Sequence, residues 1–211
     1  MAAAIDELIR ISGDPLAGQL IELPRQQLEG GGARAELDQL LRAKNGFLAF
    51  ESALLVLPSR TVHGVPGLTE WNAPHGWRRH YDSVPNDLVF FALDLFCGQF
   101  GVSSDGVLRL DLESGKTELV AADLQQWGAR ILANYDFETG WSLAHDWQVR
   151  FGALPIGSRL LGRKPFVLGG AYEVENLVPL PLAEAAEKLG GLYRQIRDVP
   201  DGMQITVKNW L

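Results

Sequence analysis

The chain has 211 residues, of which 46% are hydrophobic and 21% charged, and its formal net charge is -7 at pH 7. A chain of this length can bury one sizeable core without disulfides or metals. Its acidity argues against a nucleic-acid-binding protein, because phosphate contacts need clustered lysines and arginines.

The single cysteine, Cys97, excludes a disulfide within the chain and favours a reducing compartment. We expect it to be a small buried residue in a strand, since free cysteine is among the most buried residue types.

The N-terminal sequence MAAAIDELIR carries Asp6 and Glu7 and lacks the apolar centre of a signal peptide. No apolar run approaches the roughly 20 residues of a transmembrane helix. These features predict a cytoplasmic protein that does not insert into a membrane.

The N-terminal part of the chain shows helical periodicity in two places. Residues 4–11 place apolar side chains on one helical face, and a second helix is expected from Ala33 to a stop at Asn45-Gly46. Between the two, Gly30-Gly31-Gly32 predicts a flexible spacer that no helix or strand interior would tolerate.

The middle of the chain is rich in strand signals. Residues 47–57 predict a strand or a strand pair, and residues 59–87 predict a long irregular loop, a kind of segment that is often functional. Further strand candidates follow at residues 88–93, 100–102, 107–112 and 117–120. Because short turn sequences join these candidates, we expect the sheet to be antiparallel here.

Large apolar residues in these strands define a central sheet. The residues expected to contribute to it are Phe90, Phe91, Leu93, Leu108 and Leu110. Alternation in the sequence VLRLDL places Leu108 and Leu110 on one face of a strand, and Arg109 and Asp111 on the other.

Helical signals dominate the C-terminal part. Asp123 followed by Gln126 forms a capping-box pattern at the start of an apolar helical face. Further helices are expected from Thr139 and from Pro181, and strands at 166–168, 171–178 and 203–207. The elements together predict an α+β fold, a single domain with a mixed or mainly antiparallel sheet packed against helices. Its parts are an N-terminal helical segment and glycine-rich spacer at 1–32, a core at 33–135, and a C-terminal α/β extension of the same domain at 136–211.

Patterns for metal, nucleotide or nucleophile chemistry are weak. His75 and His80 lie five residues apart, but zinc sites need further ligands at short spacings, and the chain has neither a cysteine pair nor a His-Glu-x-x-His pattern. Gly98 and Gly101 lack the context of a dinucleotide site and indicate a bulge or a close backbone approach. No Gly-x-Ser-x-Gly elbow is present. We therefore expect no metal and no cofactor.

Four carboxylates gather in the central segment, namely Asp94, Asp105, Asp111 and Glu113. A pair of them could perform acid–base chemistry if one were desolvated in a pocket. The interpretation that we favour is structural, because Asp105 suits a turn and Asp111 and Glu113 suit an exposed strand end.

The irregular loop carries large aromatic side chains, which are enriched at protein interfaces. We predict that Trp71, Trp77 and Tyr81 bind a partner, and that Asp105 and Glu113 are weaker candidates for meeting a basic surface. The neighbouring Arg78-Arg79 could bind an anion or a nucleic acid. A solvated basic loop is the preferred interpretation, because the rest of the chain is acidic.

The order of parts over residues 33–133 resembles the SUKH superfamily, which includes Smi/Knr-type regulators of fungal cell-wall synthesis and many bacterial immunity proteins. The resemblance is carried by LDQLLRAKNGF, SALLVLP, LVFFALDLFCGQFGV, GVLRLDLESGK and DLQQWGARIL. It implies an α+β fold without enzymatic activity, and its bacterial members typically bind and neutralise a toxin, often a nuclease. The chain departs from the pattern in the glycine spacer after Leu23-Pro24 and in its last 70 or so residues, which have no counterpart.

These observations predict a non-enzymatic protein-binding domain, an immunity protein that neutralises a basic, nuclease-like toxin. Two alternatives stay open. One is a regulatory scaffold of cell-wall or envelope synthesis, and the other is a small-molecule enzyme whose pocket residues come from scattered loops. A deep pocket with convergent polar groups would favour the enzyme.

Overall fold

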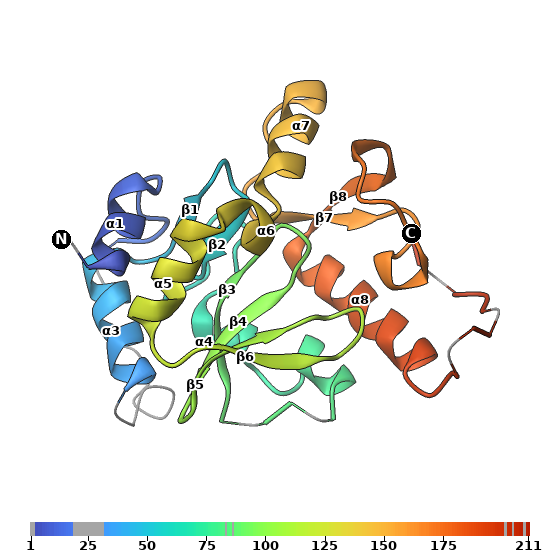
Figure 1. Cartoon of the computed structure of the whole chain (residues 1–211), viewed down its shortest axis with the longest axis horizontal. Helices are drawn as coiled ribbons and strands as arrows, with labels where there is room; N and C mark the ends of the chain where they lie inside the picture. The colour runs from blue at the N-terminus through green and yellow to red at the C-terminus, as the bar shows by residue number, and fades with distance from the viewer. Residues whose placement is uncertain are drawn as a thin grey trace.

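A six-stranded antiparallel sheet runs through the computed structural model, which describes residues 3–18, 32–82, 84–85, 87–200, 202–203, 205–208 and 210–211 (Figure 1). Its strands are β1 (Phe47–Ala49), β2 (Leu54–Val56), β3 (Val89–Leu93), β4 (Gln99–Ser103), β5 (Gly106–Leu110) and β6 (Thr117–Ala121). They lie side by side in chain order, so each pairs with its neighbours in sequence. The predicted antiparallel sheet is confirmed, and residues 47–57 form a strand pair.

One face of the sheet is covered by α1 (Ala4–Ile11), α3 (Ala33–Ala43) and α5 (Leu124–Ala133) (Figure 1). The ring of Trp127 on α5 packs edge-on against Phe91 and Phe100, with ring centroids 4.9 and 5.7 Å away. The Asp123 carboxylate accepts the N–H of Gln126 and caps α5, as the sequence predicted. Part of the apolar core therefore lies on this face.

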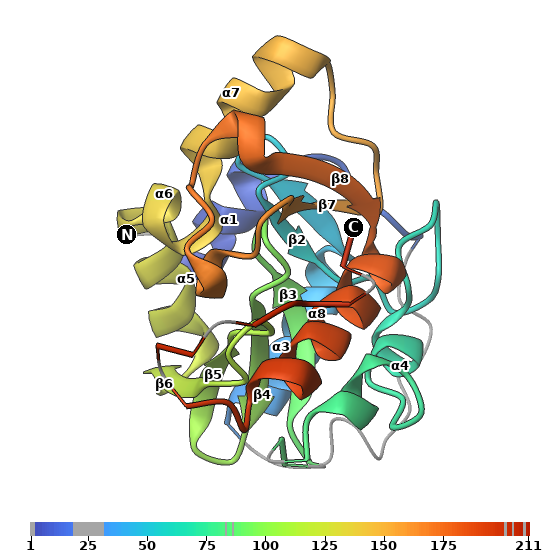
Figure 2. The same ribbon diagram turned by 90° about the vertical axis from the view of Figure 1, so that its right-hand side faces the viewer.

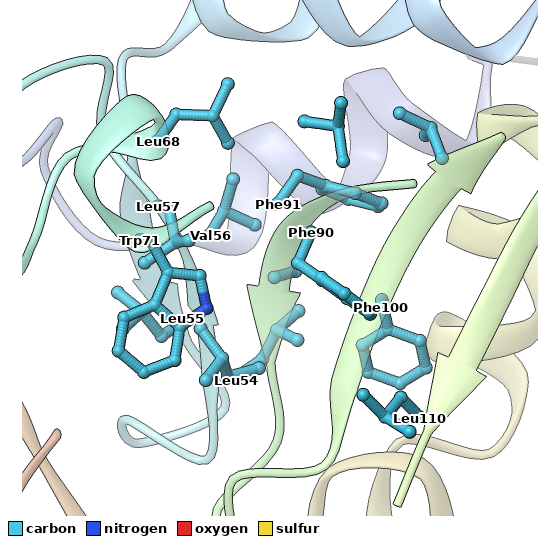
Figure 3. Close-up of a cluster of buried hydrophobic side chains, with 14 of the residues drawn as sticks. Leu54, Leu55, Val56, Leu57, Leu68, Trp71, Phe90, Phe91, Phe100 and Leu110 are labelled. Atoms are coloured by element: carbon cyan, nitrogen blue, oxygen red, sulfur yellow. The ribbon is translucent and has the colours of Figure 1, made fainter. Parts of the chain in front are cut away.

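The other face is covered by α4 (Leu68–Trp71), the short 3-10 helix η1 (Trp77–His80) and α8 (Leu182–Ile196), which crosses in front of the strands in Figure 2. Phe90 points to this side and contacts Trp77 at 5.2 Å between ring centroids. Figure 3 shows Trp71 and Leu68 of α4 among the buried side chains of β2 and β3. The predicted irregular loop thus supplies part of the core.

The C-terminal part adds α6 (Tyr135–Thr139), α7 (Trp141–Phe151) and a hairpin of β7 (Ser158–Gly162) and β8 (Leu177–Pro181). The Leu160 N–H donates to the Leu95 carbonyl at 3.0 Å and ties β7 to the turn after β3. A second apolar cluster there includes Leu95, Trp147 and Leu160. Since Leu182 and Leu189 of α8 also enter the main core, the chain forms a single α+β domain, as predicted.

Several predictions for the C-terminal part are wrong. Strand β7 was not anticipated, and the strand expected at 166–168 is the 3-10 helix η2 (Phe166–Leu168). The segment expected as a strand at 171–178 contains the 3-10 helix η3 (Val174–Asn176), and only its last two residues belong to a strand, β8. The side chain of Asn176 bonds the backbone of Lys164 and Ala171 across this segment, which strand alternation does not predict. Residues 203 and 205–207 form no strand.

Two further expectations concern the N-terminal part and Cys97. Leu23-Pro24 and Gly30-Gly31 lie outside the described residues. Cys97 is buried, as predicted, but it lies in the β3–β4 turn with a φ of 69° rather than in a strand. No helix among the described residues is long and apolar enough to cross a membrane.

Candidate functional site

A cleft of about 450 Å³ opens between the sheet and the C-terminal part. The sheet contributes side chains from the β3–β4 turn, β5, the β5–β6 turn and β6, and the C-terminal part contributes Phe166 and Tyr172. The ionisable side chains that line it are Asp94, Arg109, Asp111, Glu113, Lys116, Glu118 and Tyr172. The cleft therefore joins segments that are far apart in the sequence.

Asp94 is the most deeply buried carboxylate of the cleft, with 2% of the residue exposed. Its Oδ1 accepts the N–H groups of Phe96 and Gly98 at 2.9 and 2.7 Å, so it also closes the turn after β3. Its Oδ2 accepts from Arg109 Nη2 at 2.7 Å. Burial raises the pKa of Asp94, against the opposing effect of Arg109 and the two N–H groups. A methyl group on Gly98 would lie 2.2 Å from Oδ2, so the Asp94 side chain occupies the space that a larger residue would need.

Arg109 extends this pair into a network of four charged side chains. Its Nη1 lies 3.7 Å from the buried carboxylate of Glu138 on α6, which in turn accepts from Arg130 Nε on α5 at 2.6 Å. Burial lowers the pKa of Arg109, but Asp94 and Glu138 outweigh that effect and hold it above its usual value. Two cations and two anions thus neutralise one another beneath the cleft.

Glu113 connects the sheet to the C-terminal part. Its two carboxylate oxygens accept the N–H groups of Phe166 at 3.2 Å and Val167 at 2.6 Å, at the start of η2. Only 7% of the residue is exposed, and burial raises the pKa of its carboxyl. Glu113 therefore holds in place the segment that carries the aromatic side of the cleft.

That aromatic side consists of Phe96, Phe166 and Tyr172. Phe166 and Tyr172 stack in parallel with ring centroids 4.0 Å apart, and Phe96 meets both rings edge-on at 5.1 and 5.7 Å. Tyr172 remains 62% exposed. The cleft thus presents a rigid aromatic surface beside carboxylates.

The predicted aromatic hot spots lie elsewhere, and the expectation that they are exposed is wrong. Trp71, Trp77 and Tyr81 are each 3% exposed. Their polar atoms are satisfied inside the fold: Trp71 Nε1 donates to Gln99 Oε1, Trp77 Nε1 to the Trp71 carbonyl, and Tyr81 Oη to the Leu112 carbonyl. They pack against the sheet because large apolar surfaces are more stable out of water, so a partner cannot reach them.

The two acidic candidates are separated. Asp105 is exposed in the β4–β5 turn, whereas Glu113 lies beyond the other end of β5 and is buried rather than exposed, because it accepts the η2 amides. From Asp105 to Asp111 the chain spans about 20 Å at the usual rise of a strand. Of the four carboxylates that the sequence singled out, the cleft gathers Asp94, Asp111 and Glu113 and leaves out Asp105.

The basic loop is solvated as expected at Arg79 but not at Arg78. Arg78 is buried and donates to the carbonyls of Leu88 and Pro85. Arg79 binds Glu187 on α8 with two hydrogen bonds of 2.7 Å, and His80 Nε2 lies 3.0 Å from the same carboxylate. Within the described part of the chain, no three His, Cys, Asp or Glu side chains come together as a metal would require.

Sequence reasoning missed several side chains of the cleft. Alternation did place Arg109 on the polar face of its strand, but nothing local links it to Glu138. Phe166 and Tyr172 fall in segments that were interpreted as strands, where their stacking could not be anticipated.

No family model matches the chain, and no curated protein matches it. Among solved structures, the crystal structure of Atu4351 from Agrobacterium tumefaciens is similar, with a TM-score of 0.57 and 12% sequence identity. The likeness covers 88% of this chain and 87% of that one. At this identity it shows a shared fold alone.

Replacing Glu113 tests its connection to η2. We expect Glu113→Ala to lower the free energy of unfolding by about 2 kcal/mol, because the two N–H groups of η2 lose their acceptor. Glu113→Gln keeps an acceptor oxygen and should cost less. Both values are measured by urea unfolding.

The pH dependence supplies an independent check. Because burial raises the native pKa of Glu113, the native state binds this proton more tightly than the unfolded state. The natural chain should therefore lose stability relative to Glu113→Gln as the pH rises from the ordinary value of 4.5 through the raised native pKa. A stability difference that stays constant across that range would contradict the prediction.

Proposed function

We propose that this chain is a non-enzymatic protein-binding domain that neutralises a basic, nuclease-like toxin in the cytoplasm, as an immunity protein does. The observation that carries the proposal is the cleft, whose lining includes exposed Asp111, Glu118 and Tyr172. Carboxylates at a rim speed association with a basic surface, and an exposed tyrosine can fill a pocket of the partner.

The element order adds support. Helix α3, the β1–β2 pair, the insertion with α4 and η1, the four strands β3 to β6 and helix α5 follow one another as in the sequence pattern that resembles the SUKH superfamily. This order is compatible with a binding role for the face that β5 and β6 share with the C-terminal part.

The carboxylates of the cleft favour binding over catalysis because structural bonds already engage them. Asp94 is held by Arg109 and two N–H groups, and Glu113 by the two N–H groups of η2. Ser114, which also lines the cleft, donates its hydroxyl to Asp111 at 2.9 Å. That hydrogen bond closes an exposed turn, and apart from it no acid or nucleophile of the described lining residues lies beside a base of its own.

One observation favours the alternative of a small-molecule enzyme. Burial raises the pKa of both Asp94 and Glu113, and the two side chains line the same cleft, as a pair of acid–base residues would. For an enzyme, Glu113→Gln should abolish function while leaving binding of a protein partner intact. For the proposed immunity protein, protection should instead depend on the exposed carboxylates Asp111 and Glu118.

Coexpression with a toxin encoded beside this gene tests the function. We expect cells that make both proteins to survive, and Asp111→Lys/Glu118→Lys to reduce protection by about tenfold or more in surviving colonies, because two reversed charges repel a basic partner. The matched control is Asp14→Lys/Asp146→Lys, which changes the net charge equally at exposed positions outside the cleft.

The outcomes are distinct. If cells die as readily with the protein as without it, the immunity function is wrong. If both double variants protect equally well, the cleft is not the surface that meets the toxin.

A further inference from the structure

The exposed ring of Tyr172 is the most accessible apolar surface of the cleft. It is 62% exposed, yet its parallel stack on Phe166 and its edge contact with Phe96 fix its orientation. Glu113 in turn fixes Phe166 through its N–H group. A ring that is already held in place loses little conformational entropy when a ligand stacks on it.

The charges that remain available in the cleft are mainly negative. Asp94 and Glu138 neutralise Arg109, so its guanidinium is not available to an incoming anion. The exposed carboxylates of the lining are then Asp111 and Glu118, and its one further cation is Lys116. Glu118 is exposed on β6 opposite Arg109 in the register of β5 and β6, and its charge helps to raise the pKa of that guanidinium. Within the described part of the chain, no hydrogen bond occupies its carboxylate oxygens.

The field of these carboxylates reaches the aromatic side. Burial raises the pKa of the Tyr172 hydroxyl, and Glu113, Asp111 and Asp94 raise it further, in that order. Arg109 opposes this effect in part. Carboxylates and the exposed ring thus line the same cleft. A planar cation can use both at once, because the face of an aromatic ring attracts cations and carboxylates accept their N–H groups.

We propose that the cleft binds the guanidinium group of an arginine side chain on the partner, stacked on Tyr172 and donating hydrogen bonds to Asp111 and Glu118. This inference rests on the proposed function, since it names the group by which a basic partner is held. Arginine fits better than lysine, because its plane stacks on the ring and its fork of N–H donors suits a carboxylate.

The experiment uses N-acetyl-arginine amide as the probe, followed by backbone amide NMR shifts of the full chain. We expect saturable shifts confined to β6, the β5–β6 turn and the segment around Tyr172. N-acetyl-citrulline amide, which has the same shape without the charge, should bind about tenfold more weakly. The lysine analogue should fall between the two, since it keeps the charge and loses the stacking plane.

Two pairs of variants locate the site. Tyr172→Ala and Glu118→Gln should each weaken binding of the probe about fivefold. Tyr135→Ala is the matched aromatic control, because Tyr135 is also partly exposed and stacked, on Phe50 at 5.2 Å. Glu184→Gln is the matched carboxylate control on α8. Neither control residue lines the cleft, and both variants should bind the probe as the natural chain does.

Equal binding of the arginine and citrulline probes, tighter binding of inorganic phosphate, or shifts that lie outside the cleft would each overturn the inference. Loss of probe binding equally in the controls would do the same. If the Tyr172→Ala and Glu118→Gln variants still protect cells in coexpression and the probe does not bind, the arginine site is refuted and the proposed function stands. If the probe binds but the protein does not protect cells, the proposed function is refuted and the arginine site stands.

Discussion

Replacing Asp94 by alanine is expected to lower the free energy of unfolding by about 3 kcal/mol or more. The substitution leaves the partly buried Arg109 without its closest carboxylate and leaves the N–H groups of Phe96 and Gly98 without an acceptor. Breaking a buried ion pair from one side costs this much because the remaining charge stays out of water. Glu138, 3.7 Å from Arg109, offsets part of the loss.

Two further variants separate the ion pair from the turn. In Asp94→Asn, the amide oxygen can still accept both N–H groups, as Oδ1 does. The amide nitrogen, which is a donor, then takes the place of Oδ2 beside Arg109. The double variant Asp94→Asn/Arg109→Met removes both charges, and we expect it to be more stable than Asp94→Asn alone.

The control for this series is Asp111→Ala, which removes an exposed carboxylate from the same end of the sheet. It should cost about 1 kcal/mol at most, since its bonds to Glu113 and Ser114 close an exposed turn. Urea unfolding of all variants gives the comparison. An Asp94→Ala variant as stable as Asp111→Ala would show that the buried network contributes nothing.

Neighbouring glycines in α8 are expected to respond in opposite directions to the same substitution. A methyl group on Gly190 would lie 2.5 Å from Cδ2 of the His80 ring, whereas one on Gly191 would meet no atom within 4 Å. Gly190→Ala should therefore destabilise the fold by about 1–3 kcal/mol through overpacking. Gly191→Ala should stabilise it by up to about 1 kcal/mol, because alanine is the better helix former.

His80 cannot easily move away from Gly190. Its Nε2 is held 3.0 Å from Glu187, which Arg79 also binds, so η1 and α8 meet at a rigid contact. Thermal unfolding of the two variants measures the effect, and each serves as the control for the other. If both alanines shift the melting temperature in the same direction, the close approach of η1 to α8 is not what requires glycine at 190.

The sheet was predictable because its signals are local. Alternation around Leu108 and Leu110 and the turns on either side fix β5, and capping at Asp123 fixes the start of α5. The packing of α4 and η1 against the sheet was not predictable in the same way. Trp71 and Trp77 lie in a segment without periodicity, and their burial depends on acceptors at Gln99 and in the insertion itself.

The cleft was predictable only in part, since Phe166 and Tyr172 of its lining come from a distant segment. The sequence drew attention to Asp94, Asp111 and Glu113, which are close together in the chain. Glu113 bonds a residue 53 positions away, and no local pattern indicates that partner. The interpretation of Glu113 as an exposed residue failed for this reason: a carboxylate at a strand end is exposed unless a distant segment covers it.

The burial of Cys97 makes this chain convenient for chemical labelling. The thiolate is the species that reacts with alkylating reagents, and burial both raises the pKa of this thiol and removes it from solvent. Since the chain has no other cysteine, reagents modify the folded protein only when the turn after β3 opens. The rate of alkylation therefore reports the opening of that turn, and a cysteine introduced at the rim of the cleft would carry a probe without competition from Cys97.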